Sequence, residues 1–352
     1  MKFDVVIGNP PYQENDNGKR DDGAANASAS PLYHFFVENA TKISQIQCFI
    51  IPARWISGAG KGLGKFTKQM VNSNNVRHFC YFTNSRDIFP DNEIKGGVCY
   101  FVRDNSYNDK ANIEVYYDKK REYSRRLLDE HNIGVFIPYK ELSDTLLKVK
   151  KVSSLQDENL QQIVSVLKPY GLRTDFFKNQ EKYGLPAVQQ TRKKETDIEI
   201  LGLDMGRRVT RFVPYDYPIP TGENMVNSYK VFFAYAYGAG TLGEATSTPI
   251  LGLPKQICTE TYLTIGNFKT EFEARSLINY INTRFFRALV SILKTTQHST
   301  RTYRLVPMQN FTSASDIDWS KSIQDIDRQL YKKYGLSKEE IDFIETNVKE
   351  ME

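Results

Sequence analysis

The chain has 352 residues, of which 12% are aromatic, and a formal net charge of +5. It is long enough for two domains with hydrophobic cores, and its charge is too small to bind nucleic acid without local clusters of basic residues. Because there is no signal peptide and no long apolar run, we expect a cytoplasmic protein without a membrane partner. The four cysteines lack Cys-x-x-Cys spacing, which argues against a zinc site and a disulfide framework.

The first predicted element is a strand over residues 3–7, whose apolar, β-branched residues are typical of a strand buried on both faces. Gly8 lets the chain turn, and the corner Asn9-Pro10-Pro11-Tyr12 follows at the carboxyl end of the strand, where open α/β sheets bind ligands. The Asn9 side-chain oxygen and the Pro10 carbonyl can accept the two hydrogens of an exocyclic amine while Tyr12 stacks on its ring. The alternative is a proline-rich turn that only ends a strand.

Alternating polar and apolar stretches continue to residue 102. The polar, small-residue segment 13–30 predicts a loop, which is either an ordinary surface loop or a segment that becomes ordered on DNA. The glycine-rich run 58–65 fits neither of the phosphate-binding patterns Gly-x-Gly-x-x-Gly and Gly-x4-Gly-Lys-Ser/Thr. It therefore predicts a turn before a helix. The remaining predicted elements are a helix over 31–46 with the apolar stripe Leu32, Phe35, Phe36, Ala40 and Ile43, a helix over 65–72, and strands over 47–53, 76–82 and 97–102.

Four segments in this order resemble the S-adenosylmethionine-dependent N6-adenine DNA methyltransferases of restriction–modification systems, the Asn-Pro-Pro-Tyr class of the Eco57I/TaqI-like group. They are Asn9–Tyr12, Leu32–Phe36, Ile50–Trp55 and Asp87–Pro90. The resemblance implies a Rossmann-like sheet, S-adenosyl-L-methionine as co-substrate, double-stranded DNA as substrate and a cognate restriction endonuclease as a possible partner. No metal is implied, and the Pro90-Asp91 and Glu93-Ile94-Lys95 residues lie too close together in sequence to form a nuclease metal site.

The same resemblance implies roles for individual residues. Asn9, Pro10, Pro11 and Tyr12 are the expected catalytic residues, and Tyr12 and Phe89 are expected to stack on a flipped adenine. Asn9 and Phe36 are expected to contact the methyl donor. For both phenylalanines the alternative is an ordinary place in the core.

The carboxyl-terminal two thirds of the chain have a different pattern. We expect short strands over 113–117 and 133–138, helical structure over 139–168, and short strands and turns from 169 to 310 that include a long helix over 271–294. Two tail helices are expected over 321–334 and 337–350, the second with a capping box at Ser337 and Glu340. Basic residues interleaved with aromatics indicate either a DNA-reading surface or a solvated basic face. The DNA-binding candidates are Lys193, Arg207, Arg208, Arg211, Arg301 and Arg304.

The fold class is therefore predicted to be α/β, with the second half of a Rossmann-like methyltransferase sheet followed by an α+β target-recognition domain. The predicted divisions are a partial catalytic domain over 1–110, a partly helical connection over 111–168, a DNA target-recognition domain over 169–310 and a helical tail over 311–352.

No glycine-rich turn followed by acidic strand ends, as needed to hold a methyl donor, precedes the corner. We therefore expect a chain incomplete at its amino end, or one whose donor-binding half comes from a partner chain. The predicted function is methyl transfer from S-adenosylmethionine to the N6 of a flipped adenine in duplex DNA. The alternatives are a non-catalytic, sequence-specific DNA-binding subunit and a protein or RNA N-methyltransferase.

Overall fold

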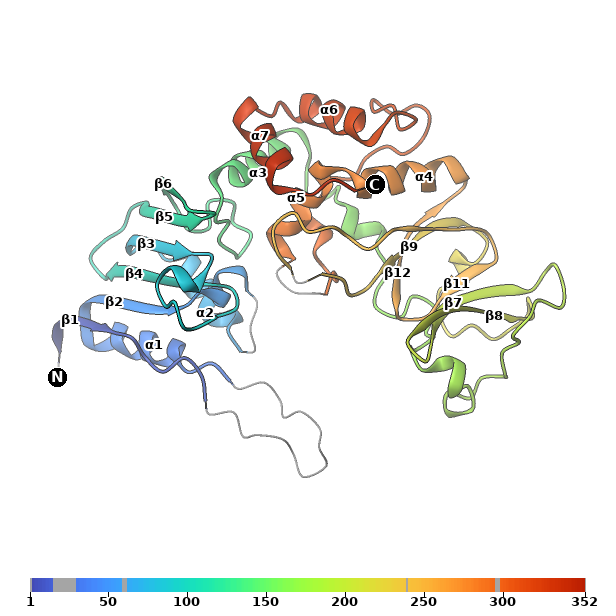
Figure 1. Cartoon of the computed structure of the whole chain (residues 1–352), viewed down its shortest axis with the longest axis horizontal. Coiled ribbons are helices and arrows are strands. Elements are labelled where there is room, and N and C mark those ends of the chain that lie inside the picture. The colour runs from blue at the N-terminus through green and yellow to red at the C-terminus, as the bar shows by residue number, and fades with distance from the viewer. Residues whose placement is uncertain (1, 15–29, 59–61, 239, 295–297, 352) are drawn as a thin grey trace. The chain divides into compact units, whose positions relative to one another are not determined.

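A computed structural model describes residues 2–14, 30–58, 62–238, 240–294 and 298–351. The chain forms two compact units, Met1–Ser143 and Asp144–Glu352 (Figure 1). The first unit extends beyond the expected domain limit at residue 110, because two further strands complete its sheet. The predicted loop over 13–30 lies largely outside the described residues.

The first unit is built on one six-stranded mixed sheet in the order β1-β2-β4-β3-β5-β6. Strands β1 and β2 are parallel, as are β3 and β5, whereas β4 runs antiparallel to both of its neighbours and β6 antiparallel to β5. The carboxyl ends of β1, β2, β3 and β5 therefore lie at the same edge of the sheet. The strands are β1 (Phe3–Gly8), β2 (Ser44–Pro52), β3 (Val76–Phe82), β4 (Val98–Asp104), β5 (Ala111–Tyr117) and β6 (Lys120–Arg126).

Helices α1 (Tyr33–Ile43) and α2 (Gly64–Val71) pack on one face of this sheet. The buried side of α1 consists of Tyr33, Val37 and Ala40. The predicted apolar stripe was wrong in part, since Ala40 is buried whereas Phe35, Phe36 and Ile43 are exposed. The reason is that Tyr33 packs edge-to-face on Phe66 of α2, which turns the neighbouring phenylalanines outward.

Strand β1 is an edge strand. The prediction that it is buried on both faces was wrong, because β2 is its sole strand partner among the described residues. Val6 packs against the core, whereas Phe3 and Val5 are about half exposed and Ile7 is 74% exposed. The prediction of strands at the positions of β2 to β5 is confirmed, and the mixed sheet confirms the α/β class.

The second unit contains two three-stranded sheets, in the orders β10-β9-β12 and β11-β7-β8. Strands β9 and β12 are antiparallel, and so are β7 and β8. These strands are β7 (Ile198–Asp204), β8 (Arg207–Val213), β9 (Tyr229–Ala234), β10 (Ile250–Gly252), β11 (Gln256–Cys258) and β12 (Tyr262–Phe268). The helices after β6 are α3 (Lys140–Val152), α4 (Glu271–Asn282), α5 (Arg284–Leu293), α6 (Ile323–Tyr334) and α7 (Lys338–Asn347).

The single helix predicted over 271–294 is two helices that meet at Thr283. Thr283 has an extended backbone, with φ −65° and ψ 150°, and its hydroxyl accepts from the Phe286 N–H to cap α5. The carboxylate of Asp327, on α6, accepts from the N–H groups of Arg284 and Phe285 at 2.9 Å each. This fixed break satisfies donors that a helix start leaves unpaired.

The other predictions for this part of the chain have mixed outcomes. Residues 133–138 do not form a strand, and the predicted helical segment 139–168 is helical over Lys140–Val152 and over the short 3-10 turn Leu160–Ile163. The two tail helices and the capping box at Ser337 and Glu340 are confirmed. All four cysteines are free thiols, three of them buried. Within the described residues, no helix is both long and apolar enough to cross a bilayer.

Candidate active site

Three loops meet the same edge of the six-stranded sheet, because β1, β2 and β3 run in the same direction. The corner Asn9–Tyr12 follows β1, the 3-10 turn Ala53–Ser57 follows β2, and residues 83–97 connect β3 to β4. Asn9 and Pro11 are exposed, Tyr12 is partly exposed and Pro10 is buried. The predicted corner is thus presented outward at the carboxyl edge, where such sheets bind ligands.

The chain beyond the corner returns to it through a short antiparallel stem. The Leu32 N–H donates to the Tyr12 carbonyl at 3.1 Å, and the Glu14 N–H donates to the Ser30 carbonyl at 3.0 Å. These bonds hold the start of α1 beside the corner. Among the described residues, no N–H donates to the Pro10 carbonyl, which leaves it available as an acceptor.

Two tyrosines near the corner, Tyr12 and Tyr33, have raised pKa values. Burial raises the pKa of Tyr12, the hydrogen-bonding side chain of Asn9 lowers it, and the nearby Cys99 thiol adds to the rise. Burial also raises the pKa of Tyr33, again with a contribution from Cys99. The Tyr12 hydroxyl is buried although the residue is partly exposed. Because its pKa is raised, Tyr12 is a neutral phenol near pH 7.

The loop that carries Phe89 is braced by Ser85. The Ser85 hydroxyl donates to the Asn92 carbonyl at 3.0 Å and accepts from the Ile94 N–H at 2.8 Å. The Phe89 N–H donates to the Ser85 carbonyl at 2.8 Å, and the Phe89 side chain is partly exposed. Phe89 is therefore held at the rim of the sheet.

Tyr12 and Phe89 follow strands that are three positions apart in the sheet, since β2 and β4 lie between β1 and β3. At the usual strand spacing the two strand axes are about 14 Å apart. A sandwich around one base needs its two rings about 7 Å apart. The two loops must therefore lean toward each other, and the shared role of Tyr12 and Phe89 stays a prediction. Phe36 lies on the first turns of α1 and is 46% exposed.

The part of the chain that carries the corner has known relatives. Residues 1–89 match the Eco57I restriction-modification methylase family. We refer to these residues as the Eco57I-type region. Over 153 residues the chain is 31% identical to a Mycoplasma pneumoniae (strain ATCC 29342 / M129) protein named as an uncharacterized adenine-specific methylase. The match covers 43% of this chain and 35% of that relative, so the chain spans about a third of its length.

Two solved restriction–modification enzymes are similar in structure over 98% of this chain. The type IIG restriction endonuclease BpuSI has 13% sequence identity and a TM-score of 0.38, with 54% of its chain covered. The type IIL enzyme MmeI, solved in complex with DNA, has 9% identity and a TM-score of 0.41, with 56% covered. The family match and the adenine-specific relative confirm the resemblance that the sequence motifs predict.

Outside the Eco57I-type region, the predicted DNA-binding residues differ in their surroundings. The Arg211 guanidinium bonds the Asp204 carboxylate at 3.1 Å and lies over the Phe177 ring. Arg208 lies over the Tyr262 ring, with its carbon 5.8 Å from the ring centroid. Lys193, Arg207, Arg208, Arg301 and Arg304 are exposed. Arg211 is therefore partly buried by contacts within the protein, whereas the other five residues are exposed.

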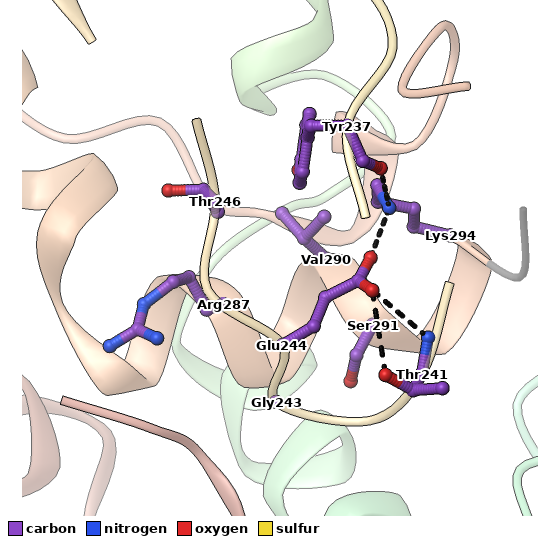
Figure 2. Close-up of a pocket in the computed structure, with 9 residues that line it drawn as sticks. All are labelled: Tyr237, Thr241, Gly243, Glu244, Thr246, Arg287, Val290, Ser291 and Lys294. Carbon is purple, nitrogen blue, oxygen red and sulfur yellow. Dashed lines mark hydrogen bonds and ion pairs between the residues drawn. The ribbon is translucent and has the colours of Figure 1, made fainter. Parts of the chain in front are cut away.

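A small pocket in the second unit, near the Gly238-Ala239-Gly240 stretch, is shown in Figure 2. The Glu244 carboxylate accepts from the N–H of Gly240 and pairs with the Lys294 ammonium, which also donates to the Tyr237 carbonyl. Lys294 lies over the Tyr237 ring as well. The Glu244 carboxylate thus satisfies both the Gly240 N–H and the Lys294 ammonium, and we assign this pocket no ligand.

Sequence reasoning gave no role to several residues around the corner. Arg54 donates from Nε to the Lys95 carbonyl at 2.9 Å and so joins the loops after β2 and β3. Tyr33 and Cys99 are buried in the core of the first unit. A sequence signal existed for Arg54 alone, which lies within the Ile50–Trp55 segment that resembles the methyltransferases.

Proposed function

We propose that this chain carries the base-binding and catalytic face of an enzyme that methylates N6 of adenine in duplex DNA, as the modification component of a restriction–modification system. One observation carries the proposal. The exposed Asn9 amide and the partly exposed Tyr12 ring lie at the carboxyl edge of parallel strands, within the Eco57I-type region.

The proposed reaction begins with extrusion of the adenine from the duplex, because its N6 is otherwise out of reach. The base stacks on the neutral Tyr12 ring, with Phe89 as the second wall. The Asn9 side-chain oxygen and the Pro10 carbonyl accept the two N6 hydrogens. These contacts direct the N6 lone pair toward the methyl group and stabilise the positive charge that develops on nitrogen. The proton then leaves to solvent, and no side chain of the protein serves as a nucleophile.

S-adenosylmethionine supplies an electrophilic methyl group when it is bound. Asn9 and the exposed ring of Phe36 are the residues that we propose contact it. Within the described residues β1 has no strand partner on its outer edge, which favours a shared donor site in which a further strand pairs with β1 and brings the rest of the donor pocket. That strand would belong to a partner chain or to another segment of a longer protein. The competing function is a non-catalytic DNA-binding subunit, because such a subunit would need no complete pocket for the methyl donor.

The test is methylation of plasmid DNA in cells that lack adenine methylation, with and without the candidate partner chain. Long-read sequencing should find N6-methyladenine at one sequence motif. Asn9→Ala should abolish this signal and leave duplex binding within about twofold, because in the proposed complex Asn9 contacts the base and the methyl donor but no phosphate. Asn112→Ala, an exposed asparagine at the start of β5, is the matched control. Methylation of RNA or of a protein glutamine, with unmodified DNA, would contradict the substrate class.

A further inference from the structure

Arg54 lies at the edge of the sheet that carries the corner. It lies in the 3-10 turn Ala53–Ser57 after β2, and β2 is next to β1 in the sheet. Its Nε donates to the Lys95 carbonyl at 2.9 Å, in the loop that carries Phe89. The Arg54 side chain thus joins the loop after β2 to the loop that carries Phe89.

The connection between β3 and β4 is shaped around this side chain. Gly96 has φ +87°, and a Cβ there would lie 2.9 Å from the Arg54 Cγ. The Gly97 carbonyl accepts from the Ala53 N–H at 3.0 Å, which fixes the loop against the residue before Arg54. The Arg54 side chain is therefore held in one place by its stem and by Nε.

The outer part of the guanidinium remains free. Arg54 is exposed, and its two Nη groups have no acceptor within the described chain. The other exposed arginines of this unit are mostly ion-paired, as Arg77 is with Asp104 and Arg86 with Glu93. A planar pair of Nη donors, fixed through Nε and turned to solvent, matches the oxygens of a phosphate.

We propose that Arg54 is a positioning residue that binds a backbone phosphate flanking the flipped adenosine. This inference rests on the proposed function and adds a contact to the nucleotide backbone, beside the base contacts of Asn9 and Tyr12. A fixed phosphate limits how far the extruded nucleotide can swing, so that its base reaches the corner in one orientation.

The experiment is a double-mutant cycle on duplex binding, in which Arg54 is substituted in the protein and individual phosphates are neutralised in the DNA. The duplex carries the motif found by methylation mapping, and each phosphate around the target adenine is replaced in turn by a neutral methylphosphonate. At one flanking position this replacement should weaken binding by the wild-type protein about tenfold, as expected for loss of a charged hydrogen bond. The same replacement should have no effect on Arg54→Gln, which has already lost the contact.

Arg54→Lys keeps the charge and loses the paired donors, so it should recover part of the binding and little of the methylation rate. Arg77→Gln is the control, because the Arg77 side chain is 54% exposed and lies near the amino end of β3, away from the carboxyl edge that carries the corner. Equal methylphosphonate effects in wild type and Arg54→Gln at every position would overturn the proposal for Arg54. Absence of methylation and of specific binding by the wild-type protein would instead contradict the proposed function.

Discussion

Lys230, in strand β9, is a lysine with no exposed surface. Its Nζ donates to the carbonyls of Met225 at 2.7 Å and Val226 at 2.9 Å, which end the 3-10 turn Glu223–Met225. Burial lowers the pKa of Lys230 to about 7, with a small opposing effect from Cys258. A neutral amine has two hydrogens for these two carbonyls, so the side chain serves the fold with or without its charge.

This residue predicts a pH dependence of stability. The unfolded chain holds the Lys230 proton up to the ordinary lysine pKa of 10.5, whereas the folded chain releases it near 7. Between these values the unfolded state binds more protons, so the free energy of unfolding should rise with pH. Urea unfolding of Lys230→Met should lack this rise, whereas Lys269→Met, at an exposed position, should keep it. Parallel pH profiles for wild type and Lys230→Met would contradict the shift.

Individual residues of the candidate site were predictable from sequence only where their chemistry is local. Asn9 and Tyr12 could be identified because four consecutive residues and one preceding strand define the corner. The contact that Arg54 makes could not, although Arg54 lies in a recognisable segment, because it depends on the Lys95 carbonyl, 41 residues further along the chain. The exposure of Phe36 was equally hidden, since it follows from the packing of Tyr33 on Phe66.

The same distinction holds for whole elements. Strands β2 to β5 were predictable from their apolar residues, because they are buried whichever strands they pair with. The break between α4 and α5 was not, since Asp327 stabilises it from 42 and 43 residues away in sequence. The strand expected over 133–138 fails for a related reason. Its buried residues Val135 and Phe136 reach the core from an irregular segment.

In the connection between β3 and β4, the close approach of the backbone at Gly97 can be tested by substitution. Gly97 has φ +77°, and a Cβ there would lie 2.1 Å from the Phe82 carbonyl oxygen. Gly134 has nearly the same φ, +81°, and a Cβ there meets nothing within 4 Å. Gly134→Ala should cost about 1 to 2 kcal/mol for the left-handed backbone alone. Gly97→Ala should cost about 1 to 3 kcal/mol more, because the clash is with backbone. Equal losses in chemical denaturation would refute the close approach at Gly97.

Strand β8 carries the proposed DNA contacts most directly. Arg207 and Arg208 are exposed, whereas Arg211 is bound to Asp204. If the first two bind phosphates, Arg207→Gln with Arg208→Gln should reduce the salt slope of duplex binding by about 1.8, or about 0.9 for each contact. Arg328→Gln, which removes an arginine that is 70% exposed on α6, should leave the slope unchanged. A slope unaffected by the double substitution would make these residues an ordinary solvated face.

At the scale of the whole molecule, the outstanding feature of the first unit is its open sheet edge. On its outer side β1 has no strand partner within the described chain, and Phe3, Val5 and Ile7 expose 45%, 50% and 74% of their surfaces. Unpaired N–H and C=O groups beside an apolar row favour the addition of another strand. The corner is presented by this same strand, so whatever covers the edge also borders the proposed donor site.

The isolated chain should therefore self-associate through β1 and bind S-adenosylmethionine weakly or not at all. Ile7→Lys places a charge on the exposed row and should shift sedimentation velocity profiles toward the monomer. Val166→Lys changes a valine that is 77% exposed in the second unit and should leave the profile unchanged. Addition of a chain that completes the donor pocket should both disperse the self-associated species and produce donor binding in calorimetry. A monodisperse wild-type monomer with micromolar donor affinity would contradict the shared site, because the donor pocket would then lie within this chain.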